Sequence, residues 1–424
     1  MNVRIESSKI VKPLYDAGGG ARRRRRPARA VFDKVTYDVY MAVIYAFRPP
    51  TPPNAALELG LAKTLAVYRE WAGELADGGD AVLLNDRGGG GGGGGALFVE
   101  ATVSAPLAAV MPFGPSPELL RLHPSRRRPR RPGAGARAAH AVRLRLAGDR
   151  IHHHRVAYGQ AAGNFLVAWG LASRRLPVAP LPVCDRATRF PPRHPPLVQF
   201  PHRDTEYYAP KKKKKNHDAG AVAVEDDDDE LATVAHDKIK HVRERGRPPL
   251  AHGLAAGEAT TLRVSVNGRT RMRPAVPRGY FGNLVLWAFP RCAAGELASR
   301  PVQHAAELIR RAVARADDAY FRSFVDFASS GAVEAEGLAA TADESQAVLC
   351  PDVEVDSWLG IDFYELDFGG GGGGGGPFYF TPSYLPMEGT VFLVPSFAGD
   401  GGIDAYVALF ETHLDEFKKI CYTY

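Results

Sequence analysis

Stretches with the periodicity of strands alternate with stretches that have the periodicity of helices, in both halves of the chain. In residues 31–47 apolar side chains recur at every second position, as in a strand with one buried face. Residues 54–73, with Asn54 as the expected cap, and 301–327 have a helical stripe, and 261–266 again favours a strand. The other predicted elements are strands over 81–84, 96–103, 283–289, 378–380 and 390–394 and helices over 162–174 and 404–417. With no internal repeat, this order predicts an α/β fold (α+β, mixed sheets).

A chain of 424 residues usually divides into two domains, because single hydrophobic cores stop growing near about 250–300 residues. We predict a first domain over 1–180, a linker rich in proline and charge over 181–240, and a second domain over 241–424. Eight glycines at 88–95 are interpreted as an expanded hairpin loop between the two flanking strands. They lack the GK[ST] sequence that follows a phosphate-binding loop, so we do not predict nucleotide binding there.

The composition is typical of a soluble globular protein, since 45% of residues are hydrophobic and no apolar run is long enough to span a bilayer. The first residues, MNVRIE, are charged and do not form the apolar centre of a signal peptide. We therefore expect a cytoplasmic protein without a membrane partner.

Much of the positive charge behind the net charge of +7 lies in short runs. Where the charge lies matters more for predicting a nucleic-acid partner than its total. Basic runs occur at Arg22–Arg26, Arg126–Arg131 and Lys211–Lys215, and the last is followed by the acidic run Glu225–Glu230. A nucleic-acid surface would combine basic residues with aromatic ones on a folded face, and these runs contain no aromatic residue. We interpret them as solvated segments and expect no specific nucleic-acid partner.

The cysteines are far apart and form no CxxC pair, and no histidine follows one at the spacing of a zinc motif. We therefore predict free, mostly buried thiols and no structural metal. The four cysteines are Cys184, Cys292, Cys350 and Cys421.

Three short blocks occur in a fixed order and are the most specific signals in the sequence. The first is HHRVAYG at 153–159, followed by NF at 164–165 and AWG at 168–170. The second is SVNGRTR at 265–271 with GYFGN at 279–283, and the third is DFGGG at 367–371. Together they resemble the HxxxDG, GRxR…GYFGN and DFGWG segments of the plant BAHD acyltransferases, which depend on acyl-CoA.

A finer resemblance concerns the subgroup of this family. Gly370 replaces the tryptophan of DFGWG, and PFYF follows at 377–380, with SWL at 357–359 before it. These features look most like the grass hydroxycinnamoyl-CoA amine acyltransferases that act on agmatine, tryptamine or putrescine.

The resemblance implies two chloramphenicol-acetyltransferase-like domains with an active-site channel between them. It assigns the general base to His154, beside His153 in the motif, because an imidazole can take a proton from the attacking amine or hydroxyl and return it to the thiolate. Acyl-CoA is then a co-substrate, and neither a held cofactor nor a metal is expected. The implied protein is a monomer with a small amine or alcohol acceptor.

The resemblance also assigns supporting roles. In the family an aspartate lies four residues after the base and pairs with a buried arginine, for which Arg269 is the candidate; here the aspartate is replaced by Tyr158, which precedes Gly159. Loss of one partner from a buried ion pair costs about 3–5 kcal/mol. The run Asp367-Phe368-Gly369 is expected to be structural.

Two segments, 125–150 and 241–252, do not resemble the family's elements at these places, a strand before the histidine loop and a helical region of the second domain. A shifted reading frame in GC-rich DNA would produce such sequence, a hypothesis that sequencing the transcript tests. The alternative to an active enzyme is therefore a BAHD-fold protein that is inactive, or whose gene was incorrectly delineated, and that acts, if at all, as a binding protein with nonspecific polyanion contacts.

Overall fold

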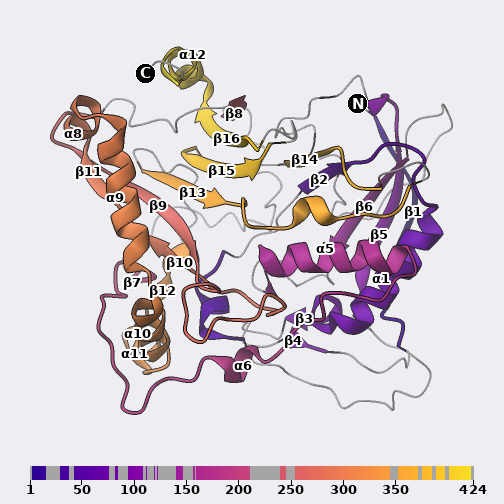
Figure 1. Ribbon diagram of the computed structural model, residues 1–424, viewed down its shortest axis with the longest axis horizontal. Coiled ribbons are helices and arrows are strands. Elements are labelled where there is room, and N and C mark those ends of the chain that lie inside the picture. Colours follow the sequence, from indigo (N-terminus) through magenta and orange to yellow (C-terminus); the bar gives the residue numbers. More distant parts are fainter. Residues whose placement is uncertain are drawn as a thin grey trace, which may run out of the picture.

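The computed structural model describes most of the chain, and all structural statements refer to that part (Figure 1). The described residues are 2–15, 29–37, 43–75, 82–84, 94–107, 111, 119, 122, 140–146, 156–157, 159–210, 239–244, 254–343, 352–370, 375–383, 388–396 and 401–421. The runs Arg22–Arg26, Arg126–Arg131, Lys211–Lys215 and Glu225–Glu230 lie outside them.

A three-stranded antiparallel sheet forms the N-terminal part, in the order β1-β5-β6. Its strands are β1 (Val3–Val11), β5 (Ala96–Val103) and β6 (His140–Leu146). Helices α1 (Asn54–Val67) and α5 (Gln160–Ser173) pack on one another beside this sheet (Figure 1).

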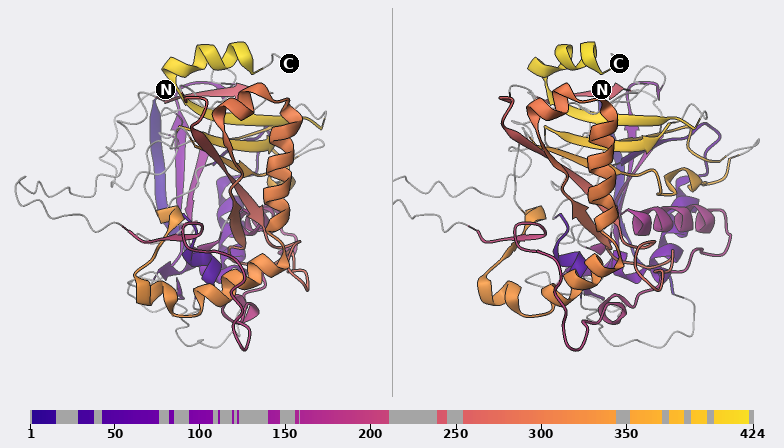
Figure 2. Two further views of the ribbon diagram at one scale, coloured as in Figure 1. Left: turned by 90° about the vertical axis from the view of Figure 1, so that its left-hand side faces the viewer. Right: turned by 60° about the vertical axis from the view of Figure 1, so that its left-hand side comes forward.

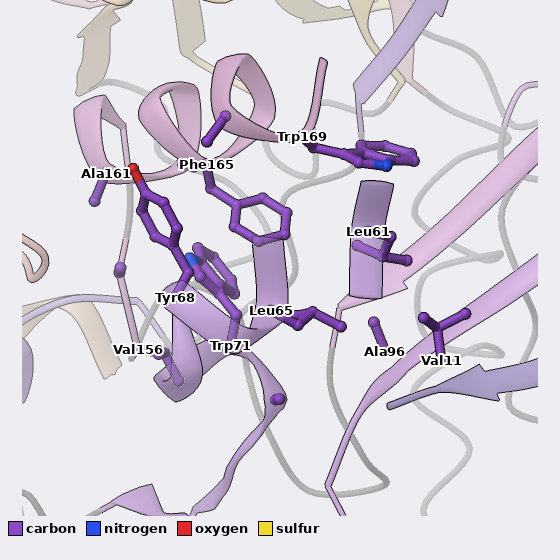
Figure 3. Close-up of a cluster of buried hydrophobic side chains, with 14 of the residues drawn as sticks. Val11, Leu61, Leu65, Tyr68, Trp71, Ala96, Val156, Ala161, Phe165 and Trp169 are labelled. Atoms are coloured by element: carbon purple, nitrogen blue, oxygen red, sulfur yellow. The ribbon is translucent and has the colours of Figure 1, made fainter. Parts of the chain in front are cut away.

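The contact between α1 and α5 depends on a small residue. A Cβ atom at Gly60 would lie 2.2 Å from the Ser173 hydroxyl, so only glycine allows the two helices to approach this closely. Phe165 and Trp169 point from α5 toward Leu61, Leu65 and Trp71 in the core beneath (Figure 3).

A seven-stranded sheet forms most of the C-terminal part, in the order β10-β9-β13-β15-β16-β8, with β11 paired to β9. Strand β13 runs parallel to β9 and β15, and the other pairs are antiparallel. The predicted mixed sheets are therefore confirmed. The strands are β8 (Ile239–Glu244), β9 (Ala259–Asn267), β10 (Val285–Ala288), β11 (Arg291–Ala293), β13 (Val353–Ser357), β15 (Thr390–Pro395) and β16 (Ile403–Phe410).

Helices cover this sheet and its ends (Figure 2). The longer ones are α9 (Val302–Arg315), α10 (Asp318–Ala328) and α12 (Glu411–Ile420). The shorter elements are η1 (Val31–Lys34), η2 (Arg69–Ala72), β3 (Glu74–Leu75), β4 (Val82–Leu83), α6 (Arg186–Arg189), β7 (Tyr207–Tyr208), α8 (Ala294–Ser299), α11 (Ala332–Glu336), β12 (Ala339–Ala340), η3 (Thr341–Asp343) and η4 (Phe363–Glu365). Among the helices of the described residues, none has the length and apolar character needed to cross a bilayer.

Segments from the two ends of the chain share cores and strands. Strand β2 (Val43–Ala46) pairs with β14 (Tyr379–Pro382). Phe32 packs with the aromatic side chains of α10, and Phe368 packs with Trp169 of α5. The domain boundaries 1–180, 181–240 and 241–424 stay a prediction.

The single strand predicted over 31–47 is wrong at its start. Residues Val31–Lys34 form the 3-10 helix η1, and the part of the predicted strand that the described residues show is β2; residues 38–42 lie outside them. The carboxylate of Asp33 accepts a hydrogen bond of 2.8 Å from the backbone N–H of Ala30, and such a local bond competes with strand pairing.

Two predicted helices are also corrected. The helix over 301–327 is two helices, because Asp317 caps α10 by accepting a hydrogen bond from the N–H of Tyr320 at 3.0 Å. The helix over 404–417 begins only at Glu411, since the apolar run before it is strand β16, which is buried between β15 and β8. At α1, Pro53 occupies the N-cap and Asn54 is already helical.

Three other expectations differ from the structure. The strands that flank the glycines 88–95 do not form a hairpin, since β4 pairs with β3 and β5 pairs with β1 and β6. Within 125–150, β6 supplies the strand that precedes the histidine loop, and β8 lies at the start of 241–252. In β6 the apolar residues Val142, Leu144 and Leu146 alternate with arginines, which is the period of a strand with two different faces.

Candidate functional site

Of the loop at 153–159 the structure describes Val156, Ala157 and Gly159, whereas His153, His154 and Tyr158 lie outside the described residues. Val156 and Ala157 are completely buried in the core beneath α5 (Figure 3). The chain is therefore anchored in the core from two residues after His154 onward.

The carbonyl oxygen of Val156 accepts a hydrogen bond of 2.7 Å from Nη1 of Arg186, a buried residue of α6. The same guanidinium pairs with two buried carboxylates, Asp33 at 3.1 Å and Glu70 at 2.5 Å. Asp33 in turn accepts hydrogen bonds from the backbone and side-chain N–H groups of Asn283, at 2.9 and 3.0 Å. Four segments distant in sequence thus meet behind the histidine loop.

In this cluster a single guanidinium is shared by two carboxylates. Burial raises the pKa of Glu70, although attraction to Arg186 opposes the shift. Burial alone would lower the pKa of Arg186, yet Glu70 and Asp33 outweigh it and raise that pKa well above the ordinary value. Arg186 therefore stays charged at every physiological pH and remains a donor to Val156.

At the end of the loop, Gly159 has a φ of 57°, a conformation that favours glycine. Gln160, at the start of α5, donates to Asn164 at 2.9 Å and to Asp362 at 3.0 Å. Asp362 is also paired with Arg278, whose carbonyl accepts from Asn164 at 2.9 Å. The beginning of α5 is thereby joined to two segments of the C-terminal half.

Arg269, the candidate partner of position 158, is buried as predicted and is 6% exposed. Its Nη2 donates to the carbonyl of Gly282 at 2.9 Å, and its guanidinium lies over the ring of Tyr280 at 5.6 Å. Burial lowers the pKa of Arg269 to about 10. No carboxylate of the described residues lies within ion-pair distance of this guanidinium.

The run Asp367-Phe368-Gly369 lies against the C-terminal end of α5. One Asp367 oxygen pairs with Nη1 of Arg174 at 2.6 Å, and the other accepts the N–H of Gly369 at 2.7 Å, where φ is 80°. A Cβ atom at Gly170 would lie 2.6 Å from the Asp367 carbonyl, so glycine allows this approach. The two motif blocks at 153–159 and 367–369 thus contact opposite ends of one helix.

A second group of residues has the side-chain types of a catalytic triad, but a substrate cannot reach it. His202 lies between Glu206, at 2.9 Å, and Ser323, at 3.0 Å, and all three side chains are buried. The Ser323 hydroxyl also accepts two backbone N–H groups, from Gln199 and Phe200. A fully buried hydroxyl that accepts two such bonds has no room for a substrate. This group therefore stabilises the packing of residues 199–206 against α10.

The expectation of mostly buried thiols is wrong for the described cysteines. None of the three forms a disulfide bond, as predicted, but only Cys421 is buried, whereas Cys184 is exposed and Cys292 is partly buried; Cys350 lies outside the described residues. His304, which follows Cys292 at no zinc-motif spacing in the sequence, lies 4.0 Å from its sulfur in the fold.

Sequence reasoning missed Asp33, Glu70 and Arg186. The available signal was an ionisable residue inside an apolar stretch, as at Asp33, since such residues are rarely buried without a partner. Their pairing was not accessible, because the partners are separated by up to 153 residues.

Comparison with known proteins agrees with this arrangement. The profile of the Transferase family matches residues 1–232 and 239–423. Agmatine hydroxycinnamoyltransferase 1 of Oryza sativa subsp. japonica is 45% identical over 458 residues, with 100% of this chain and 99% of that protein covered. Agmatine coumaroyltransferase-1 of Hordeum vulgare is 45% identical and putrescine hydroxycinnamoyltransferase of Oryza sativa subsp. japonica 46%, each with 100% of both chains covered.

Solved structures support the same fold. Vinorine synthase superposes with a TM-score of 0.62 at 18% identity, over 98% of this chain and 96% of that one. TRI101 of F. graminearum, complexed with coenzyme A and deoxynivalenol, gives a TM-score of 0.57 at 16% identity, over 93% of this chain and 97% of that one.

These findings define an acyl-CoA-dependent acyltransferase. The chain belongs to the Transferase family, the BAHD acyltransferases, and the resemblance and fold class predicted from its motifs are confirmed.

Proposed function

We propose that this enzyme transfers a hydroxycinnamoyl group from a CoA thioester to an amine acceptor, agmatine or putrescine, with His154 as general base. The observation that carries the proposal is the full-length similarity, at 45–46% identity, to rice and barley enzymes named for agmatine and putrescine transfer. The coenzyme A bound to TRI101, which has the same fold, supports the donor.

In the proposed reaction the neutral amine nitrogen attacks the thioester carbonyl while His154 takes its proton. Collapse of the tetrahedral intermediate breaks the carbon–sulfur bond, and the protonated imidazole returns the proton to the departing thiolate. The products are an amide and free CoA, and no covalent enzyme intermediate forms. A single residue serves as base and acid because the pKa of histidine lies near the working pH.

The surroundings of the loop support this role for His154. Arg186 holds the Val156 carbonyl two residues after His154, and Gln160 is tied to Asp362 a few residues further on. A general base must be held within hydrogen-bond reach of its proton, and buried anchors this close to the base in sequence favour such positioning. We assign Arg269 and Asp367 supporting roles.

The proposed enzyme acts as a cytoplasmic monomer. Its partners are the acyl-CoA donor and the small acceptor, without a held cofactor, specific nucleic acid or membrane. No metal takes part in the transfer.

The test is release of free CoA thiol from p-coumaroyl-CoA with agmatine, putrescine or tryptamine in turn. We expect turnover with agmatine or putrescine and its loss in His154→Ala. A folded protein that is silent with all three acceptors overturns the proposal in favour of an inactive BAHD-fold protein.

A further inference from the structure

Three potential metal ligands meet at one place on the C-terminal half. Cys292 is in β11, Glu296 in α8 and His304 in α9. Their ligand atoms all lie within 4.8 Å of one another. Figure 1 shows these elements on the side of the molecule away from α5, so the group is separate from the helix that follows the histidine loop.

The ligand atoms lie close to the spacing of a zinc site. Zinc bonds of about 2.0–2.3 Å in a tetrahedral arrangement put ligand atoms roughly 3.3–3.6 Å apart. Here the Cys292 sulfur lies 3.2 Å from one Glu296 oxygen and 4.0 Å from the His304 Nε2, and the other Glu296 oxygen lies 3.1 Å from Nε2. With one ligand atom from each residue, all within 4.8 Å of one another, side-chain rotations of roughly 1 Å would bring the three onto one ion.

From this geometry we propose that Cys292, Glu296 and His304 form a Zn²⁺ site in which water takes the fourth position. Thiolate, imidazole and carboxylate ligands suit zinc, whereas Mg²⁺ and Ca²⁺ prefer oxygen ligands alone. Partial burial of the Cys292 and His304 side chains leaves one side open to water, as the fourth position requires.

Without metal, the carboxylate of Glu296 holds the group together. It accepts a hydrogen bond from the Cys292 thiol, and Arg300 pairs with it at 3.3 Å. Burial raises the pKa of the Cys292 thiol, and the hydrogen bond to Glu296 adds to this effect. Zinc binding therefore forms a Zn–S bond and releases the thiol proton to solvent.

Arg300 allows a test in which a substitution should raise the affinity for zinc instead of lowering it. Its guanidinium competes with a cation for the Glu296 carboxylate, since both would lie beside the same oxygen. Removal of this charge in Arg300→Gln is expected to tighten zinc binding several-fold, whereas most substitutions near a metal site weaken it.

The experiment measures Zn²⁺ affinity of the full chain, freed of any affinity tag, by competition with a chromophoric chelator. We expect one Zn²⁺ per chain, with affinity at least about 100-fold lower in Cys292→Ser and His304→Ala. Serine keeps the hydrogen bond to Glu296 but is a poor zinc ligand. Cys421→Ser and the exposed His194→Ala are matched controls that should bind zinc normally.

Cobalt distinguishes a built site from a surface histidine. The Co²⁺ protein should show a thiolate-to-cobalt charge-transfer band that is absent in Cys292→Ser. Unchanged CoA release and far-UV circular dichroism establish that each variant is folded, since the group is remote from α5. No zinc uptake, or uptake equal in the wild type and Cys292→Ser, overturns the proposal.

Discussion

The guanidinium of Arg186 and the main-chain carbonyl of Val156 are joined by a buried hydrogen bond of 2.7 Å, two residues after His154. The bond links the histidine loop to the ion pairs of Arg186 with Asp33 and Glu70. The position of the proposed base thus depends on charges supplied by distant parts of the chain.

Replacement of Arg186 should therefore reduce both stability and turnover. Arg186→Leu leaves two buried carboxylates uncompensated, which costs about 3–5 kcal/mol in the free energy of unfolding. Arg189→Leu, on the same short helix, removes only a partly exposed pair with Asp185 and should cost no more than about 1 kcal/mol. Urea unfolding measures both.

Arg186→Lys separates positioning from stability. Lysine keeps the charge but not the planar fork that serves two carboxylates and a carbonyl. We expect a folded protein whose kcat falls while its KM changes little. A folded Arg186→Lys variant with full kcat would contradict the positioning role.

His154→Ala should lower kcat by at least about 100-fold, because general acid–base catalysis contributes roughly 10²–10⁴-fold. Release of CoA thiol at saturating substrate is the measurement. His152→Ala removes a neighbouring imidazole and should retain most of the activity; equal losses in both variants would show that the assignment of His154 is wrong.

Tyr158→Asp should restore the ion pair that the family places here. Arg269 is a buried cation whose pKa is lowered to about 10 by burial, so a new carboxylate beside it should stabilise the fold by about 1.5–3 kcal/mol and raise turnover. The control is Arg269→Met, in which the gain from Tyr158→Asp should vanish. An equal gain in both backgrounds would exclude the pairing.

The two oxygens of Asp367 allow another comparison. Arg174→Gln removes only a partly exposed ion pair and should cost less than about 1 kcal/mol. Asp367→Ala also removes the acceptor for the N–H of Gly369 and should cost about 1–2 kcal/mol more. Thermal unfolding of the two variants measures which substitution costs more stability. A larger loss of stability in Arg174→Gln than in Asp367→Ala would contradict the prediction.

Asp326 predicts a dependence of stability on pH. Burial alone would raise its pKa, but hydrogen bonds from the backbone N–H groups of Arg193 and Leu197, together with the Arg193 side chain, lower it below the ordinary value. Its stabilisation is therefore present above the unfolded-state pKa and is lost as pH falls through the folded-state pKa.

Asp326→Asn should accordingly cost about 1.5–3 kcal/mol near neutral pH, and the difference from the wild type should shrink in acid. Urea unfolding across this range is the measurement. Glu307→Gln, on an exposed face of α9, is the matched control and should change little at any pH. A cost for Asp326→Asn that stays constant with pH would rule out the carboxylate as its source.

The sequence by itself determined the family, the interleaved fold class and several of the longer helices and strands. Local periodicity was sufficient for α5, which spans Gln160–Ser173 where 162–174 was predicted, and for β5, which matches its prediction at Ala96–Val103. Motif order located the histidine loop and the run at Asp367, because both are short contiguous signals.

The tertiary structure alone decided what surrounds these motifs. Asp33 meets Arg186 across 153 residues, and Cys292 meets His304 only after β11, α8 and α9 have packed. The apolar run of strand β16 fits a helix or a strand by sequence, and it is a strand because β15 and β8 pair with its edges while two hydrophobic clusters bury its two faces. Periodicity reports contacts within about one helical turn or strand, whereas burial and charge pairing depend on segments that only folding brings together.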